Sequence, residues 1–240
     1  MLLHSLEVAR TYDSLILQAE FYRGLLAETV GKVRKGYTER AVEKGAFFFH
    51  QEDAAEHLYL LADGRVKMVQ LAEDGQQVTM RIILPGQLFG GMAVLGGKAT
   101  YPVSAEAMEA SIALCWKGEM LLGLARTDPS LGLKMTELMY AHVQELQNRF
   151  RELATERVER RVARTLLRLL TQAGRKVKEG VLIDLPLSRQ GIAEMAGTTL
   201  FTVSRLVSEW ERGGILDVGR ERVVVRNPHA LVMVAEDLKE

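Results

Sequence analysis

A single cysteine, Cys115, occurs among the 240 residues of the chain. One thiol cannot form an intramolecular disulfide, a four-cysteine iron–sulfur cluster or a cysteine-rich zinc site. The sequence also has no run of about 18 uninterrupted apolar residues, which a membrane-spanning helix requires. Its first residues, MLLHSLEVARTYDSL, contain neither the basic segment nor the sustained apolar core of a secretory signal. We therefore expect a cytoplasmic protein with no membrane partner and no iron–sulfur cluster.

The chain carries no net charge, because 31 basic side chains balance 31 acidic ones. The balance is uneven along the sequence. Residues 1–150 carry 15 basic and 18 acidic side chains, residues 151–240 carry 16 and 13, and nine basic residues fall within 151–178. A local excess of this kind attracts a polyanion such as nucleic acid. Internal ion pairs on a solvated helix face are the alternative, and charge alone favours that alternative.

Short strand-like runs dominate residues 36–119, and turn signals such as Pro85-Gly86 and Gly96-Gly97 separate them. Many short strands at nearly regular spacing predict a sandwich or a small barrel. An apolar repeat at helical spacing predicts a helix before them, from residue 14 to about residue 30. The predicted strands are 46–50, 57–61, 65–71, 77–83, 101–108 and 111–116.

A long helix is predicted from Leu131 to about Thr155, opened by Asp128-Pro129-Ser130. Proline is tolerated in a first helical turn, because its missing N–H would have no partner there. One stripe of side chains follows the helix at spacings of three and four, which fits a two-stranded coiled coil better than burial in a monomer. Packing against the chain's own barrel is the alternative. We predict a homodimer whose interface contains Met135, Leu138, His142 and Leu146.

Residues 187–207 have the pattern of a helix–turn–helix. Ser188 is suited to cap a first helix, and Thr198 or Thr199 a second one. Gly197 falls at the turn between them, where a positive φ is needed. The runs 214–218 and 222–226 then form a paired wing. The side chains predicted to face the interior are Ile192, Ala193, Met195, Ala196, Val203, Leu206 and Val207.

The outer face of the second helix carries residue types that read DNA. Arg205 is suited to guanine, whose O6 and N7 atoms in the major groove accept a bidentate pair of hydrogen bonds from arginine. Hydroxyls and helix N-termini suit phosphate oxygens. An ordinary helical hairpin is the alternative, which the order of caps, glycine and wing disfavours. The predicted DNA contacts are Ser188, Arg189, Thr199, Leu200, Phe201, Thr202 and Arg205.

These features together resemble the CRP/FNR (cyclic-AMP receptor protein / fumarate-nitrate reductase regulator) family. The resemblance implies an α+β fold: an N-terminal β jelly-roll sensor domain (1–127), a long dimerisation helix (128–156) and a C-terminal winged helix–turn–helix (157–240). It implies a homodimeric regulator, not an enzyme, that binds a near-palindromic double-stranded operator, responds to an effector and works with RNA polymerase. The matching motifs are Phe21-Tyr22-Arg23-Gly24-Leu25, Glu43-Lys44-Gly45, residues 59–67 and Gly86-Gln87-Leu88-Phe89-Gly90.

Two departures from the family pattern concern the effector. Gly91 stands where relatives that bind cyclic AMP have a glutamate for the ribose, and Tyr101 stands at about the position of the arginine for the cyclic phosphate. A buried phosphate without that positive charge costs on the order of several kcal/mol. We therefore expect an effector other than cyclic AMP. The predicted effector pocket consists of Phe89, Gly90, Gly91, Met92, Tyr101, Val103 and Ser104.

A third departure concerns the reading of bases. Phe201 stands where relatives commonly have a glutamate that accepts a hydrogen bond from cytosine. Phenylalanine cannot accept that bond, but it can contact a thymine methyl group.

Three alternative functions remain at this point. The first is a haem-based gas sensor, and its axial ligand would come from His4, His50, His57, His142 or Cys115. The second is a ligand-free, constitutive DNA-binding protein. The third is a jelly-roll metal enzyme, which the lack of an H-x-H pair disfavours.

Overall fold

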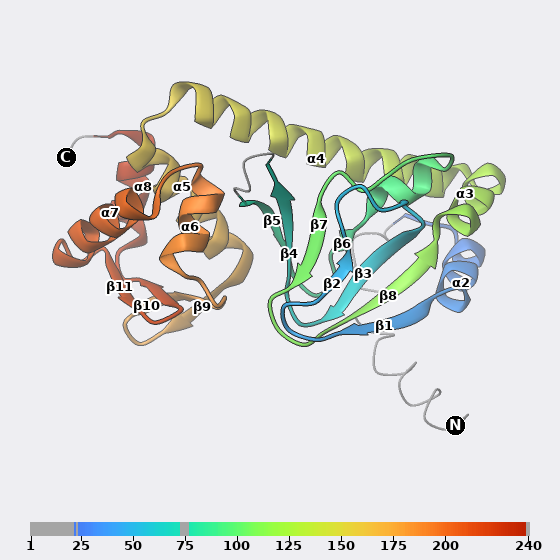
Figure 1. Cartoon of the computed structure of the whole chain (residues 1–240), viewed down its shortest axis with the longest axis horizontal. Helices are drawn as coiled ribbons and strands as arrows, with labels where there is room; N and C mark the ends of the chain where they lie inside the picture. The colour runs from blue at the N-terminus through green and yellow to red at the C-terminus, as the bar shows by residue number, and fades with distance from the viewer. Residues whose placement is uncertain (1–21, 23, 73–76, 239–240) are drawn as a thin grey trace. The chain divides into compact units, whose positions relative to one another are not determined.

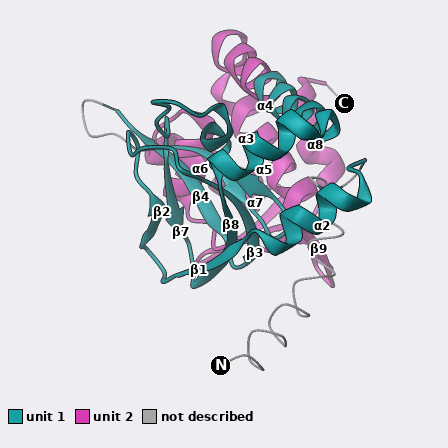
Figure 2. Ribbon diagram, turned by 90° about the vertical axis from the view of Figure 1, so that its right-hand side faces the viewer, with its two compact units in different colours: residues 1–144 teal, residues 145–240 magenta. Residues whose placement is uncertain are grey.

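The computed structural model describes residues 22, 24–72 and 77–238, and the chain forms two compact units, residues 1–144 and 145–240 (Figures 1 and 2). The first unit is a β-sandwich with helices, and the second contains a helix–turn–helix. The helix α4 (Pro129–Thr155) is continuous from the first unit into the second. This order of sandwich, long helix and helix–turn–helix agrees with the α+β fold predicted from the sequence.

Two antiparallel four-stranded sheets build the sandwich (Figure 1), with the orders β1-β8-β3-β6 and β2-β7-β4-β5. Both sheets contribute to one hydrophobic cluster, which is therefore the core between them. The strands are β1 (Thr38–Val42), β2 (Phe47–Phe49), β3 (His57–Asp63), β4 (Val66–Leu71), β5 (Gln77–Ile83), β6 (Leu88–Phe89), β7 (Ser104–Ala107) and β8 (Ser111–Lys117).

The central strand β3 is buried on both faces, because successive side chains of a strand point to opposite sides. Tyr59 and Leu61 belong to the cluster between the sheets, whereas Leu58 and Leu60 belong to a second cluster with the helices. Helices α2 (Ala27–Lys35), α3 (Gly118–Thr127) and the start of α4 supply that second cluster. The indole of Trp116, fully buried there, donates a hydrogen bond to the carbonyl of Val33 over 2.7 Å.

The sequence mispredicted several element boundaries. Of the helix predicted over 14–30, residues 14–21 and 23 lie outside the described residues. So do residues 73–76, which include the further turn signal Glu73-Asp74-Gly75. Gly24 has a φ of 83°, which interrupts the helix, and α2 begins only at Ala27. The strand predicted over 101–108 shrinks to β7, because Pro102 cannot donate to a strand ladder. Strand β1 was missed, since its side chains are mostly exposed and its pairing with β8 maintains it.

Helix α4 begins where the sequence predicted, and Asp128 caps it. The Asp128 carboxylate accepts hydrogen bonds from the Ser130 backbone N–H at 2.9 Å and from the Ser130 hydroxyl at 2.6 Å. The Thr29 hydroxyl of α2 donates to the same carboxylate. The Ser130 bonds, followed by the Thr29 bond, hold the pKa of Asp128 below its usual range. The negative charge of Asp128 at the first turn also interacts favourably with the positive end of the helix dipole.

The stripe predicted as a dimer seam belongs in part to the sandwich. Leu131 is fully buried, and Met135 and Leu138 pack against the cluster beneath α2 and α3. The alternative of packing against the chain's own barrel is therefore correct for this half of α4. Seven large apolar side chains of α4 are exposed. Leu133 and Tyr140 lie apart, and the other five follow a neighbouring stripe with alternating spacings of four and three, namely Met139, Val143, Leu146, Phe150 and Leu153.

The C-terminal unit combines four helices, besides the end of α4, with one antiparallel sheet of order β11-β12-β10-β9 (Figure 1). Helix α8 and strand β9 were not predicted from the sequence. None of the helices described has the length and apolar character needed to cross a membrane. The elements are α5 (Val158–Ala173), β9 (Gly174–Val177), β10 (Gly180–Ile183), α6 (Arg189–Ala196), α7 (Leu200–Arg212), β11 (Leu216–Gly219), β12 (Arg222–Val225) and α8 (Pro228–Glu236).

Candidate nucleic-acid interface

Helices α6 and α7 form the predicted helix–turn–helix, joined by a turn at Gly197. Gly197 has φ 61° and ψ 51°, the left-handed conformation that glycine adopts without steric cost. Ala193 is buried where the helices cross, and Met195 is only half-buried, contrary to the sequence prediction. The predicted inner face of α7 is confirmed, with Trp210 added to it. Its buried residues are Val203, Leu206, Val207 and Trp210.

Both helices begin with a side-chain cap. The Ser188 hydroxyl accepts a hydrogen bond from the Gly191 N–H at 3.0 Å, and the Thr199 hydroxyl accepts one from the Thr202 N–H at 3.2 Å. The other N–H groups of these first turns lack helical partners, and the helix dipole places partial positive charge there. Each N-terminus is therefore electrostatically suited to an anion such as phosphate.

The residues predicted to contact DNA gather at these two helix ends. Phe201 is 80% exposed and Leu200 is 47% exposed, which is unusual for large apolar side chains on a packed helix. The side chain of Arg205, one turn further along, is 60% exposed and forms a loose ion pair with Glu209 at 3.5 Å. Arg189, at the first turn of α6, forms an ion pair with Glu211 of α7 at 3.6 Å.

A β-hairpin formed by β11 and β12 provides the predicted wing. Its turn contains Arg220, which is exposed, and Glu221, with a φ of 52°. Asp217 binds Arg222 and Arg226, each at 3.3 Å, and these hydrogen bonds, the one from Arg222 first, lower the pKa of Asp217. The wing thus carries basic side chains whose nearest carboxylate is ionised at neutral pH.

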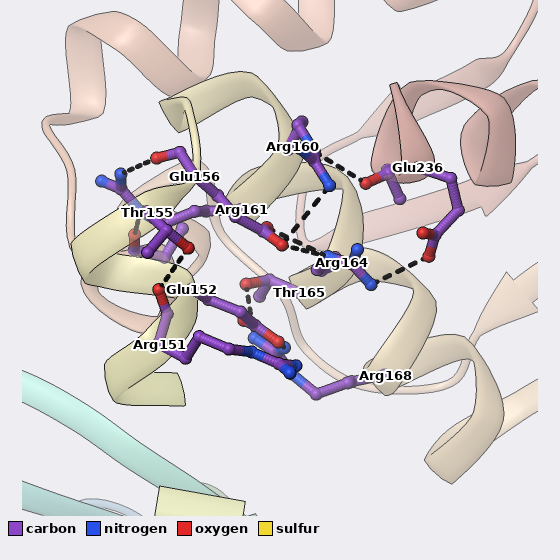
Figure 3. A network of polar contacts seen from close by, with 12 residues as sticks. Arg151, Glu152, Thr155, Glu156, Arg160, Arg161, Arg164, Thr165, Arg168 and Glu236 are labelled. Atoms are coloured by element: carbon purple, nitrogen blue, oxygen red, sulfur yellow. Dashed lines mark hydrogen bonds and ion pairs between the residues drawn. The ribbon is translucent and has the colours of Figure 1, made fainter. Parts of the chain in front are cut away.

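The arginines of α5 are engaged within the unit, so the internal alternative is correct for them (Figure 3). Arg164 binds Glu156 at 3.0 Å, and Arg168 binds Glu152 at 2.7 Å. Part of the positive excess in residues 151–178 is therefore compensated locally, whereas Arg157, Arg175, Lys176 and Lys178 of the same segment are exposed.

The residues predicted to form an effector pocket meet at the aromatic core of the sandwich. Tyr101 stacks on Phe49 with ring centroids 3.7 Å apart, and Phe89 stacks on Tyr59 at 4.9 Å. Met92 and Val103 pack against the same cluster. A Cβ on Gly90 would lie 2.9 Å from the carbonyl oxygen of His57, so a larger residue does not fit there without a shift.

The Tyr101 hydroxyl is bound by the main chain of His57. It accepts a hydrogen bond from the His57 N–H at 3.0 Å and donates one to the His57 carbonyl at 2.7 Å. Burial raises the pKa of Tyr101 and of Tyr59, so both phenols are neutral at physiological pH. Ser104 accepts a hydrogen bond from the Gln51 N–H at 2.8 Å, and Gly91 begins a short 3₁₀ helix.

The candidate haem ligands are dispersed. His50 is exposed against Phe47, His142 is exposed on α4, and His4 lies outside the described residues. The Cys115 thiol is buried and donates to the Thr38 carbonyl at 3.2 Å. Among residues 22, 24–72 and 77–238, no group of three or more His, Cys, Asp and Glu side chains is arranged to hold a metal ion.

Known proteins share both halves of this arrangement. A cyclic nucleotide-binding domain model matches residues 39–128, and a Crp-like helix-turn-helix domain model matches residues 160–234. The cyclic AMP receptor protein of Thermus thermophilus is 30% identical over 214 residues, which cover 89% of this chain and 95% of that protein. The global nitrogen regulator of Synechocystis sp. is 28% identical over 193 residues, covering 79% and 84%. The structure of FixK2 from Bradyrhizobium japonicum matches with a TM-score of 0.73 and 27% identity, covering 82% of this chain and 96% of that one.

Replacing Gly197 with alanine tests the turn geometry. The left-handed conformation of Gly197 costs an alanine about 1–2 kcal/mol, and the added Cβ would lie 2.8 Å from a methyl carbon of Leu153. We therefore expect Gly197→Ala to lower the free energy of unfolding by about that amount in urea denaturation. Gly213→Ala is the control, because Gly213 has a φ of −77° and its Cβ would meet nothing closer than 3.6 Å. Equal losses in both variants would contradict this account of the turn.

Proposed function

The chain belongs to the CRP/FNR family of transcription regulators, and on that premise we propose that it is a homodimeric, sequence-specific DNA-binding regulator controlled by an effector other than cyclic AMP. The family is one of regulators and not of enzymes. The observation that carries the proposal is the N-terminal end of α7, where a large aromatic ring and a guanidinium are exposed above a capped helix turn.

Arg205 and Phe201 are the proposed base-reading residues. Arg205 projects from the outer face of α7, two positions from the buried Val203, and its loose pair with Glu209 leaves the guanidinium free to rotate toward a guanine. Phe201 is suited to a thymine methyl group, because its ring accepts no hydrogen bond from a base edge. Leu200 extends the same apolar surface.

Contacts to phosphate would position the two base-reading residues, Arg205 and Phe201. Ser188 and Thr199 cap helices whose free N–H groups point outward, and Thr202 adds a hydroxyl 3.0 Å from that of Thr199. Arg189 contributes positive charge beside the first of these helix ends. Such contacts fix register and affinity and carry no base information.

The exposed stripe on α4 is the proposed dimer interface. Met139, Val143, Leu146, Phe150 and Leu153 recur at heptad spacing, and Phe150 is 74% exposed. Isolated exposure of this many large apolar side chains along one helix is unfavourable, and a second copy of the helix would cover them. Of the residues predicted from the sequence, Leu146 belongs to this stripe, and His142 lies beside it. Met135 and Leu138 pack against the sandwich and are half-buried, and their predicted place in the interface stays a prediction.

The effector proposal depends on Tyr101. Its ring is stacked in the core and its hydroxyl is bound to the main chain, so this position offers no positive charge to a phosphate. Gly91 likewise offers no carboxylate to a ribose. We propose that another ligand or event at this domain biases two arrangements of the dimer, and with them the recognition helices. RNA polymerase is the further proposed partner.

Charged substitutions in the exposed stripe should separate the dimer. We expect Val143→Asp combined with Phe150→Asp to give monomers in sedimentation velocity. Both copies of α4 would otherwise bury unpaired carboxylates in the dimer interface. Asn148→Asp is the control, since about 100° of rotation per residue places Asn148 on the opposite side of α4. A stable dimer in the double variant would refute this interface.

Selection from a random-sequence DNA pool tests the DNA contacts. The wild type should select a near-palindrome with half-sites about 10 bp or a close multiple apart. Arg205→Ala should lose about 1–3 kcal/mol at one symmetric base pair, and Phe201→Glu should shift the preference toward cytosine at a neighbouring position.

Two further variants complete that experiment. Arg189→Ala should weaken binding to all sequences alike and reduce the salt dependence, as a lost phosphate contact does. Arg212→Ala, an exposed arginine in the last turn of α7, should leave the selected sequence unchanged. If Arg205→Ala and Phe201→Glu both select the wild-type sequence, α7 does not read bases.

Calorimetry tests the effector assignment. We expect no heat of binding with cyclic AMP or cyclic GMP at concentrations up to about 1 mM, because a site without its two charged anchors loses most of its affinity. The cyclic AMP receptor protein of Thermus thermophilus is the positive control. A micromolar dissociation constant for this chain would show that another group binds the phosphate.

A further inference from the structure

Arg161 differs from the neighbouring arginines in what it binds (Figure 3). Arg164 and Arg168 form ion pairs with the carboxylates of Glu156 and Glu152. The hydrogen bonds of the Arg161 side chain all end on main-chain carbonyls instead. Those carbonyls belong to the ends of two different helices, so Arg161 connects the helices through their backbones.

All three nitrogens of the Arg161 guanidinium take part. Nη1 donates to the carbonyl of Glu156 at 3.0 Å, just beyond the last residue of α4. Nε donates to the carbonyl of Ala196 at 3.1 Å, and Nη2 donates to the carbonyl of Gly197 at 3.0 Å. One planar group therefore holds the end of α4 against the turn that precedes α7.

This geometry is favourable for two physical reasons. The last carbonyls of a helix have no partner within the helix, and they carry the negative end of its dipole. A guanidinium placed between two such ends satisfies both with charge-assisted hydrogen bonds in a fixed fork. A lysine at this position would keep the charge but not the fork, because its ammonium is a single point of donation.

The contact is also close to the start of the recognition helix. Thr199, the cap of α7, lies two residues beyond Gly197. Leu153 of α4 lies so near that a Cβ on Gly197 would be 2.8 Å from one of its methyl carbons. The end of α4 and the beginning of α7 thus share one small contact region, in which Arg161 supplies the hydrogen bonds.

We propose that Arg161 is a positioning residue for DNA reading, which holds α7 at a fixed orientation to the end of α4 and thereby sets the half-site spacing that the dimer accepts. The inference rests on the proposed function, in which α4 forms the dimer axis and α7 enters the major groove. The reading of bases within a half-site stays with Arg205 and Phe201 and does not depend on Arg161.

The experiment measures affinity against half-site spacing. The probes are duplexes that carry the half-site selected by the wild type, at the selected spacing and at spacings one and two base pairs shorter and longer. We expect the wild type to lose about tenfold in affinity per base pair of change and Arg161→Lys to lose about threefold or less, with unchanged base preference within the half-site. Arg160→Lys is the matched control, because Arg160 binds Glu156 and the Ala235 carbonyl without reaching the turn.

The possible outcomes separate the inference from its premise. A uniform loss of affinity at every spacing in Arg161→Lys is the result of a merely structural role and overturns the inference, as does a wild-type spacing profile. Broadening in Arg160→Lys as well overturns it too, since the effect would then be general loosening. If the wild type selects no sequence, the proposed function fails, and the inference fails with it. Arg161→Gln repeats the test without the positive charge, and Arg161→Lys suffices if that variant does not fold.

Discussion

Helix α4 is attached at both of its ends, and each attachment lies within one of the two units. At its start, Leu131 is fully buried in the cluster between the sandwich and its helices, and Asp128 caps the first turn. At its end, Glu152 and, just beyond the helix, Glu156 bind arginines of α5. A helix attached by burial at one end and by charge at the other is constrained in each unit by a different kind of interaction. Salt weakens the second kind more than the first.

Because α4 is attached at its two ends, apolar side chains in its middle are left exposed. In the first half, Leu131, Met135 and Leu138 pack against the sandwich, and in the last turn Glu152 pairs with an arginine of α5. Between them, the side chains from Met139 to Phe150 include apolar groups for which the described residues supply no full cover. The same helix therefore combines a structural role within the chain with the surface that we propose as the dimer interface.

The sequence predicted the helix–turn–helix well, because its signals are local. A cap at Ser188, a glycine at 197 and a cap at Thr199 each act within a few residues, and all three have the predicted roles. Elements maintained by tertiary contacts were harder to predict. Strand β1 has almost no apolar alternation and forms by pairing with β8, and α3 follows β8 without a capping side chain.

Parts of the candidate site were also hard to predict from the sequence, because they depend on tertiary contacts. Two apolar stripes lie side by side on α4, and the sequence contains nothing that tells which one faces the sandwich. The hydrogen bonds of Arg161 end on main-chain oxygens, which every residue possesses, so no residue type in the sequence marks them. The charge excess of α5 was visible, but its compensation by Glu152 and Glu156 depends on the fold.

The two tryptophans give this protein a built-in optical label for each unit. Trp116 is fully buried in the first unit and Trp210 is 3% exposed in the second, and the chain contains no other tryptophan. Replacing either one with phenylalanine leaves a single indole whose fluorescence reports on one unit. The unfolding of the first unit and of the second unit is therefore separable by emission spectroscopy, without any added dye.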